Sequence, residues 1–249
     1  MRSLKLTLAY DGTHFAGWQV QLNARTVQQV LEKAWNEITG ESTRLIASGR
    51  TDSGVHALAQ VVSLATESRL NAAVLQKALN ARLPNAVVVL SVEEAPDDFH
   101  AIRDAVRKRY RYVMHDGPVA DPFRRHFCWN LWQRLDAAAM HRAAQPLIGE
   151  HEFTSFQSSG SGKKTTVRTV SDLFVRREEG GQSDLILLEI EASGFLYNMV
   201  RAIVGVLVEV GRGARDEAWP EQVLKAADRR AAAMTAPPQG LFLVKVEYE

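Results

Sequence analysis

Residues 48–57 read SGRTDSGVHA, a polar loop between two segments with strand-like patterning. Two glycines bracket a charged pair here, and glycine permits tight turns and close approach of the backbone to a ligand. Arg50 and Asp52 are two residues apart, so they share one side of an extended chain. A neighbouring arginine lowers the pKa of a carboxyl group, and an ionised carboxylate serves as a nucleophile or general base. The loop alone is consistent with a salt-bridged turn or a catalytic carboxylate.

The first half of the chain alternates strands and helices around this loop. Alternating or short apolar runs predict strands at 4–10, 44–47, 59–64 and 86–92. Apolar stripes predict helices at 26–38 and 71–83. Thr26 and Gln29 form a capping box for the first of these helices, and Gly40 ends it.

The second half repeats the theme with longer strands. Strands are predicted at 107–115, 166–176, 184–192 and 241–248, and helices at 136–148, after Phe195 and at 219–228. Alternation in the strand 107–115 places Arg109 and Arg111 on one face and Tyr110 on the other. Because the order lacks a regular βαβα alternation, we predict an α+β fold with a largely antiparallel sheet.

The two halves are predicted to meet near residue 105, giving segments 1–105 and 106–249. Each half contains an Arg-Thr pair that leads into a strand, Arg50-Thr51 in the first and Arg168-Thr169 in the second. This parallel suggests two similar halves, although the sequences are not visibly repeated.

The charge is nearly balanced overall but uneven locally. Formal net charge is +1. Between Arg103 and Arg125, seven basic residues face three acidic ones, a local balance of +4. Such a patch attracts a polyanion, or it is a solvated strand face; charge alone leaves both interpretations open.

Several classes of protein and site are excluded. A single cysteine, Cys128, forms no internal disulfide and no zinc site with two thiolates. The most apolar segment, 195–210, is shorter than a membrane span and contains Arg201, so we expect a buried helix. The segment 158–166 resembles a phosphate-binding loop but lacks the required first glycine and final Ser or Thr. We expect a soluble, cytoplasmic protein that needs no metal or other cofactor.

Longer strings of residues narrow the function. The string GRTDSGVHA at 49–57 closely resembles the catalytic motif of the tRNA pseudouridine synthase I family, in which the aspartate is the nucleophile. Further blocks resemble that family in the same order, and together they span almost the whole chain: YDGTHFAGWQ at 10–19, DDFHA at 97–101, RYRY at 109–112, FTSF at 153–156, NMVRAIVG at 198–205 and GLFL at 240–243.

The resemblance implies a role for individual residues. Asp52 corresponds to the catalytic aspartate, with Arg50 as its partner in the motif. Tyr110 corresponds to the tyrosine that packs against the target base, Arg201 to the basic residue that pairs with the aspartate, and Leu241 to an aliphatic residue of the pocket. Contacts with RNA phosphates are expected from the basic residues Arg109, Arg111, Lys163, Lys164 and Arg168.

The resemblance also implies a substrate and an assembly. The substrate is tRNA, at anticodon-arm uridines 38, 39 and 40, and the protein is a homodimer in which one tRNA contacts both subunits. The implied fold has two pseudo-symmetric halves around a central antiparallel sheet, with the active site in the cleft between them. Three points of attack by Asp52 remain open: the sugar C1′, the base C6, or a sugar proton.

Two other functions compete with this one. A non-catalytic RNA-binding protein on the same scaffold would bind tRNA without changing it. A glycoside or nucleoside hydrolase would need two carboxylates roughly 5–9 Å apart, whereas the Asp52 loop offers one.

Overall fold

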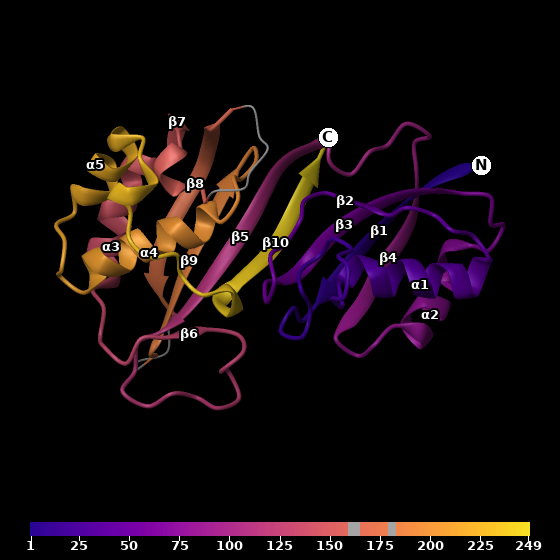
Figure 1. Cartoon of the computed structure of the whole chain (residues 1–249), viewed down its shortest axis with the longest axis horizontal. Helices are drawn as coiled ribbons and strands as arrows, with labels where there is room; N and C mark the ends of the chain where they lie inside the picture. The colour runs from indigo at the N-terminus through magenta and orange to yellow at the C-terminus, as the bar shows by residue number, and fades with distance from the viewer. Residues whose placement is uncertain (159–164, 179–182) are drawn as a thin grey trace. The chain divides into compact units, whose positions relative to one another are not determined.

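A computed structural model describes residues 1–158, 165–178 and 183–249. The chain divides into two compact units, Met1–Val106 with Phe242–Glu249, and Arg107–Leu241 (Figure 1). Both units combine helices with a mostly antiparallel sheet, which confirms the predicted α+β class. In the described part of the chain, no helix has the length and apolar character needed to cross a membrane.

The sheet of the first unit is built around its N-terminal strand. Its strands, in spatial order, are β4 (Val87–Ala95), β1 (Arg2–Tyr10), β3 (His56–Thr66) and β10 (Leu241–Tyr248), and the short β2 (Ile46–Ala47) also pairs with β3. Strand β1 is antiparallel to both neighbours, whereas β10 is parallel to β3. The predicted alternation in β1 is confirmed, because Leu4, Leu6 and Leu8 are completely buried.

Two capped helices complete the first unit. Helix α1 (Val27–Thr39) begins where the Thr26 side chain accepts a hydrogen bond from the backbone N–H of Gln29, and it ends at Gly40, whose φ is 76°. Helix α2 (Ala72–Arg82) is capped by Asn71 in the same way. Asn80 of α2 also donates to the carbonyl of Val89 and accepts from its N–H, at 2.9 and 2.8 Å. This side chain satisfies backbone groups on the outer strand of the sheet, where they would otherwise invite pairing with another chain.

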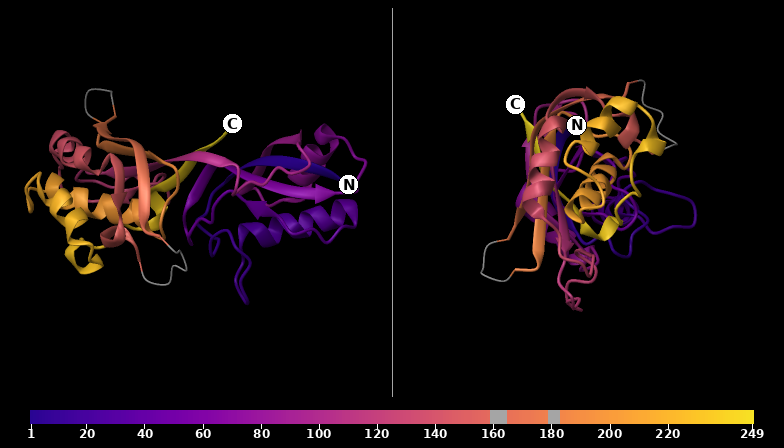
Figure 2. Two further views of the ribbon diagram at one scale, coloured as in Figure 1. Left: turned by 90° about the horizontal axis from the view of Figure 1, so that it is seen from above. Right: turned by 90° about the vertical axis from the view of Figure 1, so that its left-hand side faces the viewer.

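The second unit contains mostly antiparallel strands and a layer of helices (Figure 2). The strands, in spatial order, are β5 (Ala105–His115), β9 (Leu185–Ala192), β8 (Val167–Arg177) and β7 (Gly149–Glu152), and β6 (Trp129–Asn130) pairs with β5. Helices α3 (Ala137–Ala144), α4 (Met199–Gly211) and α5 (Trp219–Ala226) pack against one another. Helix α4 is buried at 11 of its 13 residues, as expected for the apolar segment after Phe195.

The structure differs from the sequence prediction in the end of one helix and in the unit to which the last strand belongs. The helix predicted over 136–148 ends at Ala144 and continues as a short 3₁₀ turn, Gln145–Leu147, because Pro146 lacks the N–H that an α-helix needs. The last strand, placed in the second half by the sequence prediction, belongs to the first unit from Phe242 onward, where it pairs with His56 and Ala57 of β3.

Close packing of α4 generates a stability prediction. A Cβ added at Gly205 would lie 1.9 Å from the backbone oxygen of Met234, whereas one at Gly211 would meet the flexible end of Met140 at 2.7 Å. Alanine normally stabilises a helix by about 1 kcal/mol relative to glycine. We expect Gly205→Ala instead to lower the free energy of unfolding by about 2–3 kcal/mol, and Gly211→Ala to lower it less. Urea denaturation of both variants measures the difference, and a stabilising Gly205→Ala would contradict this packing.

Candidate active site in two parts

The loop that carries Asp52 is fastened to the segment after β1. The N–H of Trp18 donates to the carbonyl of Thr51 at 3.0 Å, and the N–H of Gly54 donates to the carbonyl of Phe15 at 3.3 Å. The N–H of Val55 closes the loop on the carbonyl of Asp52 at 3.1 Å. The sequence blocks 10–19 and 49–57 therefore form one local structure.

Two glycines make this contact possible. Gly17 has a φ of 88°, and a Cβ there would lie 2.6 Å from the carbonyl oxygen of Thr51. A Cβ at Gly12 would lie 2.0 Å from the carbonyl oxygen of Val55. Only glycine allows the two backbones to approach this closely.

Buried polar groups hold the loop from beneath. The hydroxyls of Tyr10 and Thr51 are 2.8 Å apart, and Gln60 donates to the carbonyl of Gly49 at 2.8 Å. Burial raises the pKa of Tyr10 to about 12, so this hydroxyl stays protonated at neutral pH. His56 accepts from the N–H of Gly12 at 3.0 Å and stacks on Phe242, with 4.7 Å between ring centroids. The backbone around Asp52 is thus fixed from several sides.

The outer side of the loop carries the charged pair. Thr51 is buried, whereas Arg50 is exposed and Asp52 is partly exposed. This arrangement presents a carboxylate on a rigid backbone, as a nucleophile or base requires.

In the second unit, Tyr110 lies on the inner face of β5. Its side chain is 8% exposed, and its ring meets the edge of Phe195 at a centroid distance of 5.0 Å. Tyr112 is fully buried on the same face and donates from its hydroxyl to the carbonyl of Pro237 at 2.7 Å. Tyr112 is thus a core residue that is also hydrogen-bonded to the segment that precedes β10.

Arg109 and Arg111 lie on the opposite face, as predicted, but they are paired. Arg109 forms ion pairs of 3.0 Å with both Glu191 and Asp172, and Arg111 forms one of 2.7 Å with Glu189. Burial favours the neutral guanidine, yet these ion pairs outweigh it and raise the pKa of Arg109. Carboxylates of β8 and β9 thus neutralise Arg109 and Arg111, which leaves these arginines fewer N–H groups for RNA phosphates.

Arg201 and Leu241 both adjoin residues 236–240, a short segment of the second unit. Arg201 donates from Nε to the carbonyl of Ala236 and from Nη1 to the side-chain oxygen of Asn198, both at 2.7 Å. Leu241 follows this segment and is 5% exposed. Asn198, the residue that precedes helix α4, has a φ of 62°. The helix therefore begins after a left-handed residue that the sequence pattern did not indicate.

The candidate residues thus divide between the two units. Arg50 and Asp52 share a loop of the first unit, and Tyr110, Arg201 and Leu241 lie in the second. Lys163 and Lys164, expected to contact phosphates, lie outside the described residues. Sequence reasoning did not identify the positioning contacts of Phe195, Asn198 or Ala236. Phe195 and Ala236 contact Tyr110 and Arg201 from distant parts of the chain, whereas Asn198 binds Arg201 from three residues before it.

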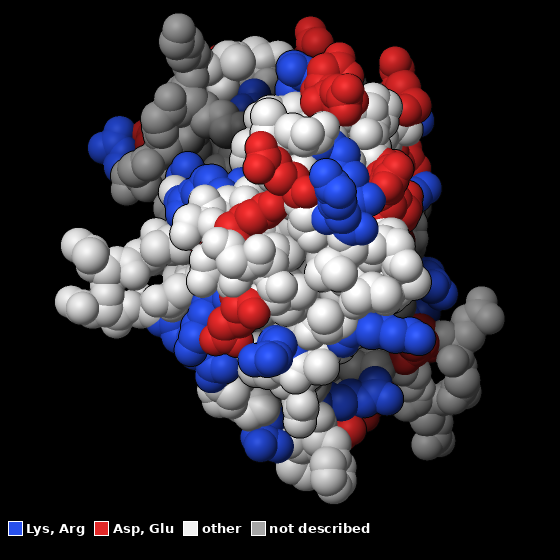
Figure 3. Space-filling view, turned by 90° about the vertical axis from the view of Figure 1, so that its right-hand side faces the viewer, with Lys and Arg blue, Asp and Glu red and all other residues white. Residues whose placement is uncertain are grey.

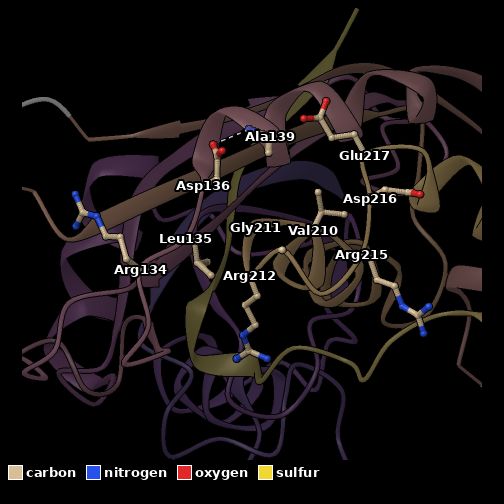
Figure 4. A pocket seen from close by; sticks show the side chains of 11 residues that line it. Arg134, Leu135, Asp136, Ala139, Val210, Gly211, Arg212, Arg215, Asp216 and Glu217 are labelled. Atoms are coloured by element: carbon tan, nitrogen blue, oxygen red, sulfur yellow. Dashed lines mark hydrogen bonds between the residues drawn. The ribbon is translucent and has the colours of Figure 1, made fainter.

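A hollow elsewhere in the second unit is not part of this arrangement. It has a volume of about 680 Å³ and is lined by the end of α4 and the start of α3, including Arg134, Asp136 and Arg212 (Figure 4). Asp136 caps α3 by accepting from the N–H of Ala139 at 2.9 Å. Arg212 directly follows α4 and lies 11 residues beyond Arg201, roughly 16 Å along a helix axis.

Surface charge in the first unit does not single out a nucleic-acid face. On the side shown in Figure 3, basic and acidic side chains are interspersed around an uncharged centre. Arg2 pairs with Glu94, and Lys5 lies 3.6 Å from Glu93. Recognition of RNA is therefore not apparent from charge on this side.

Comparison with known proteins decides the family. Residues 7–103 and 143–249 match the family model described as tRNA pseudouridine synthase. The chain belongs to the tRNA pseudouridine synthase family. It is 47% identical to tRNA pseudouridine synthase A of Thermoanaerobacter sp. (strain X514) and 43% identical to that of Acetivibrio thermocellus, over 100% of each chain. The crystal structure of a Cbf5-Nop10-Gar1 complex is similar over 96% of this chain and 57% of that one, with 12% identity and a TM-score of 0.36.

Family membership makes this protein an isomerase that converts uridine to pseudouridine in tRNA. The strings that indicated the family from sequence lie within the matched ranges, apart from RYRY at 109–112. The predicted identity is therefore confirmed, whereas the roles of individual residues rest on the local geometry described above.

The contact between Gly17 and Thr51 predicts a selective effect on this synthase. Gly17→Ala introduces both a left-handed alanine and a clash, so we expect the free energy of unfolding to fall by about 3 kcal/mol. Gly40→Ala is the matched control, because its φ is 76° but a Cβ there meets nothing within 4 Å. It should cost about 1 kcal/mol. Equal losses in chemical denaturation of the two variants would rule out the clash.

Proposed function

We propose that this synthase modifies uridines 38, 39 and 40 in the anticodon arm of tRNA, with Asp52 as the catalytic nucleophile. The observation that carries the proposal is the rigid, glycine-lined loop that presents the Asp52 carboxylate on its outer side. Resemblance to the family supports the further proposals that the enzyme acts in the cytoplasm and as a homodimer.

The reaction needs a nucleophile or base but changes no oxidation state. The N1–C1′ bond of uridine breaks, the base rotates, and a C5–C1′ bond forms. The hydrogen at C5 leaves as a proton, and N1 gains a proton, so atoms balance. Asp52 acts at the sugar C1′, at the base C6 or on a sugar proton, and each of these requires an ionised carboxylate.

Arg50 and Arg201 provide positive charge for that carboxylate in this proposal. A nearby cation favours the ionised form of an aspartate. Arg201 suits the role because contacts with Asn198 and Ala236 hold two of its N–H groups in place, which fixes the orientation of the guanidinium. A preoriented charge loses little freedom when the substrate binds.

Tyr110 and Leu241 hold the detached uracil in this proposal. Phe195 packs against the Tyr110 ring and holds it in place. An aromatic ring can stack on a base however the base is rotated within its own plane. The target base must leave its stack at a cost of a few kcal/mol, which stacking on Tyr110 partly offsets.

Tritium release from tRNA labelled at C5 of uridine tests the nucleophile. The C5–C1′ bond forms only with loss of the C5 hydrogen, so release reports the reaction itself. We expect Asp52→Asn to reduce release about a thousandfold or more while tRNA binding persists. Glu67→Gln removes an equally charged, exposed side chain of the same unit that lies outside the strings shared with the family, and it should leave release unchanged.

Three outcomes would contradict the proposal. Undiminished release by Asp52→Asn would remove Asp52 as the nucleophile. Release from a tRNA whose uridines at 38, 39 and 40 are replaced by cytidine would remove the positional assignment. Release of free uracil would favour a hydrolase.

Replacement of Tyr110 separates stacking from hydrogen bonding. Stacking on an aromatic ring contributes about 1–3 kcal/mol per base, so we expect Tyr110→Ala to lower kcat/KM by about 10–100-fold. Tyr110→Phe retains the ring and should stay within about threefold of the native enzyme. A comparable loss in both variants, measured by tritium release, would point to the hydroxyl instead of the ring.

A further inference from the structure

Arg168 differs from several other arginines of the second unit in the groups that its side chain contacts. Arg109, Arg111 and Arg177 pair with acidic side chains. Arg168, at the start of β8, donates from Nη1 to the backbone carbonyls of Thr165, at 3.2 Å, and Val167. Among residues 1–158, 165–178 and 183–249, it has no carboxylate partner. Its half-burial lowers the pKa of the guanidinium, which is the direction expected for a cation partly removed from water without an anion beside it.

The strand register puts Arg168 on the same face of the sheet as Tyr110. Lys108 of β5 and Val170 of β8 both lie opposite Ala192 of β9, so these three residues form one row across the sheet. Arg168 is two residues before Val170, and Tyr110 two residues after Lys108, so both side chains share the face of that row. Val170 is 1% exposed and Tyr110 8% exposed, which identifies this face as the inner one.

A short connection after β9 links the two side chains. The N–H of Ser193 donates to the carbonyl of Thr169 at 3.1 Å. Gly194 follows Ser193 and lies next to the Arg168 side chain, since a Cβ added at Gly194 would be 3.8 Å from Nε of Arg168. The residue after that, Phe195, contacts the Tyr110 ring. Arg168 thus lies beside the residues that hold the proposed base-stacking ring.

We propose that Arg168 binds a phosphate of the tRNA backbone next to the nucleotide held by Tyr110. The proposal deepens, and rests on, the proposed function of this site. The two backbone carbonyls both accept from Nη1 and hold that nitrogen in place. Nε and Nη2 then remain as parallel donors for phosphate oxygens, the geometry that arginine offers to an anion. Phosphate binding here orients the strand while the stacked base carries the chemistry.

The test measures the salt dependence of tRNA binding by the full-length enzyme. Each phosphate neutralised contributes about 0.7–0.9 to the slope of log Kd against log salt concentration. We expect Arg168→Gln to weaken binding about tenfold at 0.1 M salt and to reduce this slope by nearly one. Arg176→Gln is the matched control, since it removes an exposed arginine from the same strand; both its Kd and its slope should stay close to the native values.

Activity and a second substitution distinguish this site from a structural role. At saturating tRNA, Arg168→Gln should release tritium within about threefold of the native rate, because the lost contact acts on KM. Arg168→Lys keeps the charge, so the slope should remain while the loss of paired donors weakens binding severalfold. It also supplies a folded comparison if Arg168→Gln fails to fold.

Each unfavourable outcome overturns a different statement. An unchanged slope in Arg168→Gln, or a change equal to that of Arg176→Gln, removes the phosphate contact, and native affinity in Arg168→Lys removes the paired-donor geometry. Absence of tritium release by the native enzyme overturns the proposed function, yet the difference in slope between Arg168→Gln and Arg176→Gln still decides whether Arg168 meets a phosphate.

Discussion

The close approach of Gly17 to Thr51 is the constraint on which the Asp52 loop depends. Backbone hydrogen bonds from Trp18 and Gly54 join the segment after β1 to the loop before β3, at distances that exclude a Cβ from Gly12 and Gly17. A carboxylate that must meet one atom of a substrate needs a backbone that does not move, and this contact provides it. Tyr10 and Gln60 support the same loop from within the sheet.

In the second unit, buried carboxylates on β9 are paired with arginines of β5. Glu189 and Glu191 are each only 7% exposed on the outer face of β9. Arg109 and Arg111 lie directly across from them in the neighbouring strand, so each carboxylate gains a cation. The pairing neutralises one face of β5, and Tyr110 lies on the other face, where its ring contacts Phe195. A single strand therefore separates a structural ionic layer from a residue proposed to hold the base.

Local patterns predicted the elements well where the cause of the structure is local. Thr26 and Asn71 cap their helices because their side chains reach N–H groups three residues ahead, and β1 alternates because one of its faces is buried. The predicted helix over 136–148 is too long because Pro146 cannot donate the backbone hydrogen bond that would continue the α-helix. Arg109 and Arg111 of β5 could be assigned from sequence to RNA contacts or to a structural face, because their carboxylate partners lie about 80 residues away along the chain.

By itself, the sequence determined the family, the α+β class and the position of the Asp52 loop, because these depend on strings of adjacent residues and on short-range periodicity. Only the tertiary structure decided which arginines are neutralised, that β10 pairs with β3, and that Arg168 lacks a carboxylate partner among the described residues. The physical reason is that ion pairing and strand pairing depend on distances in space, and residues far apart in sequence have no local pattern that records which of them will meet.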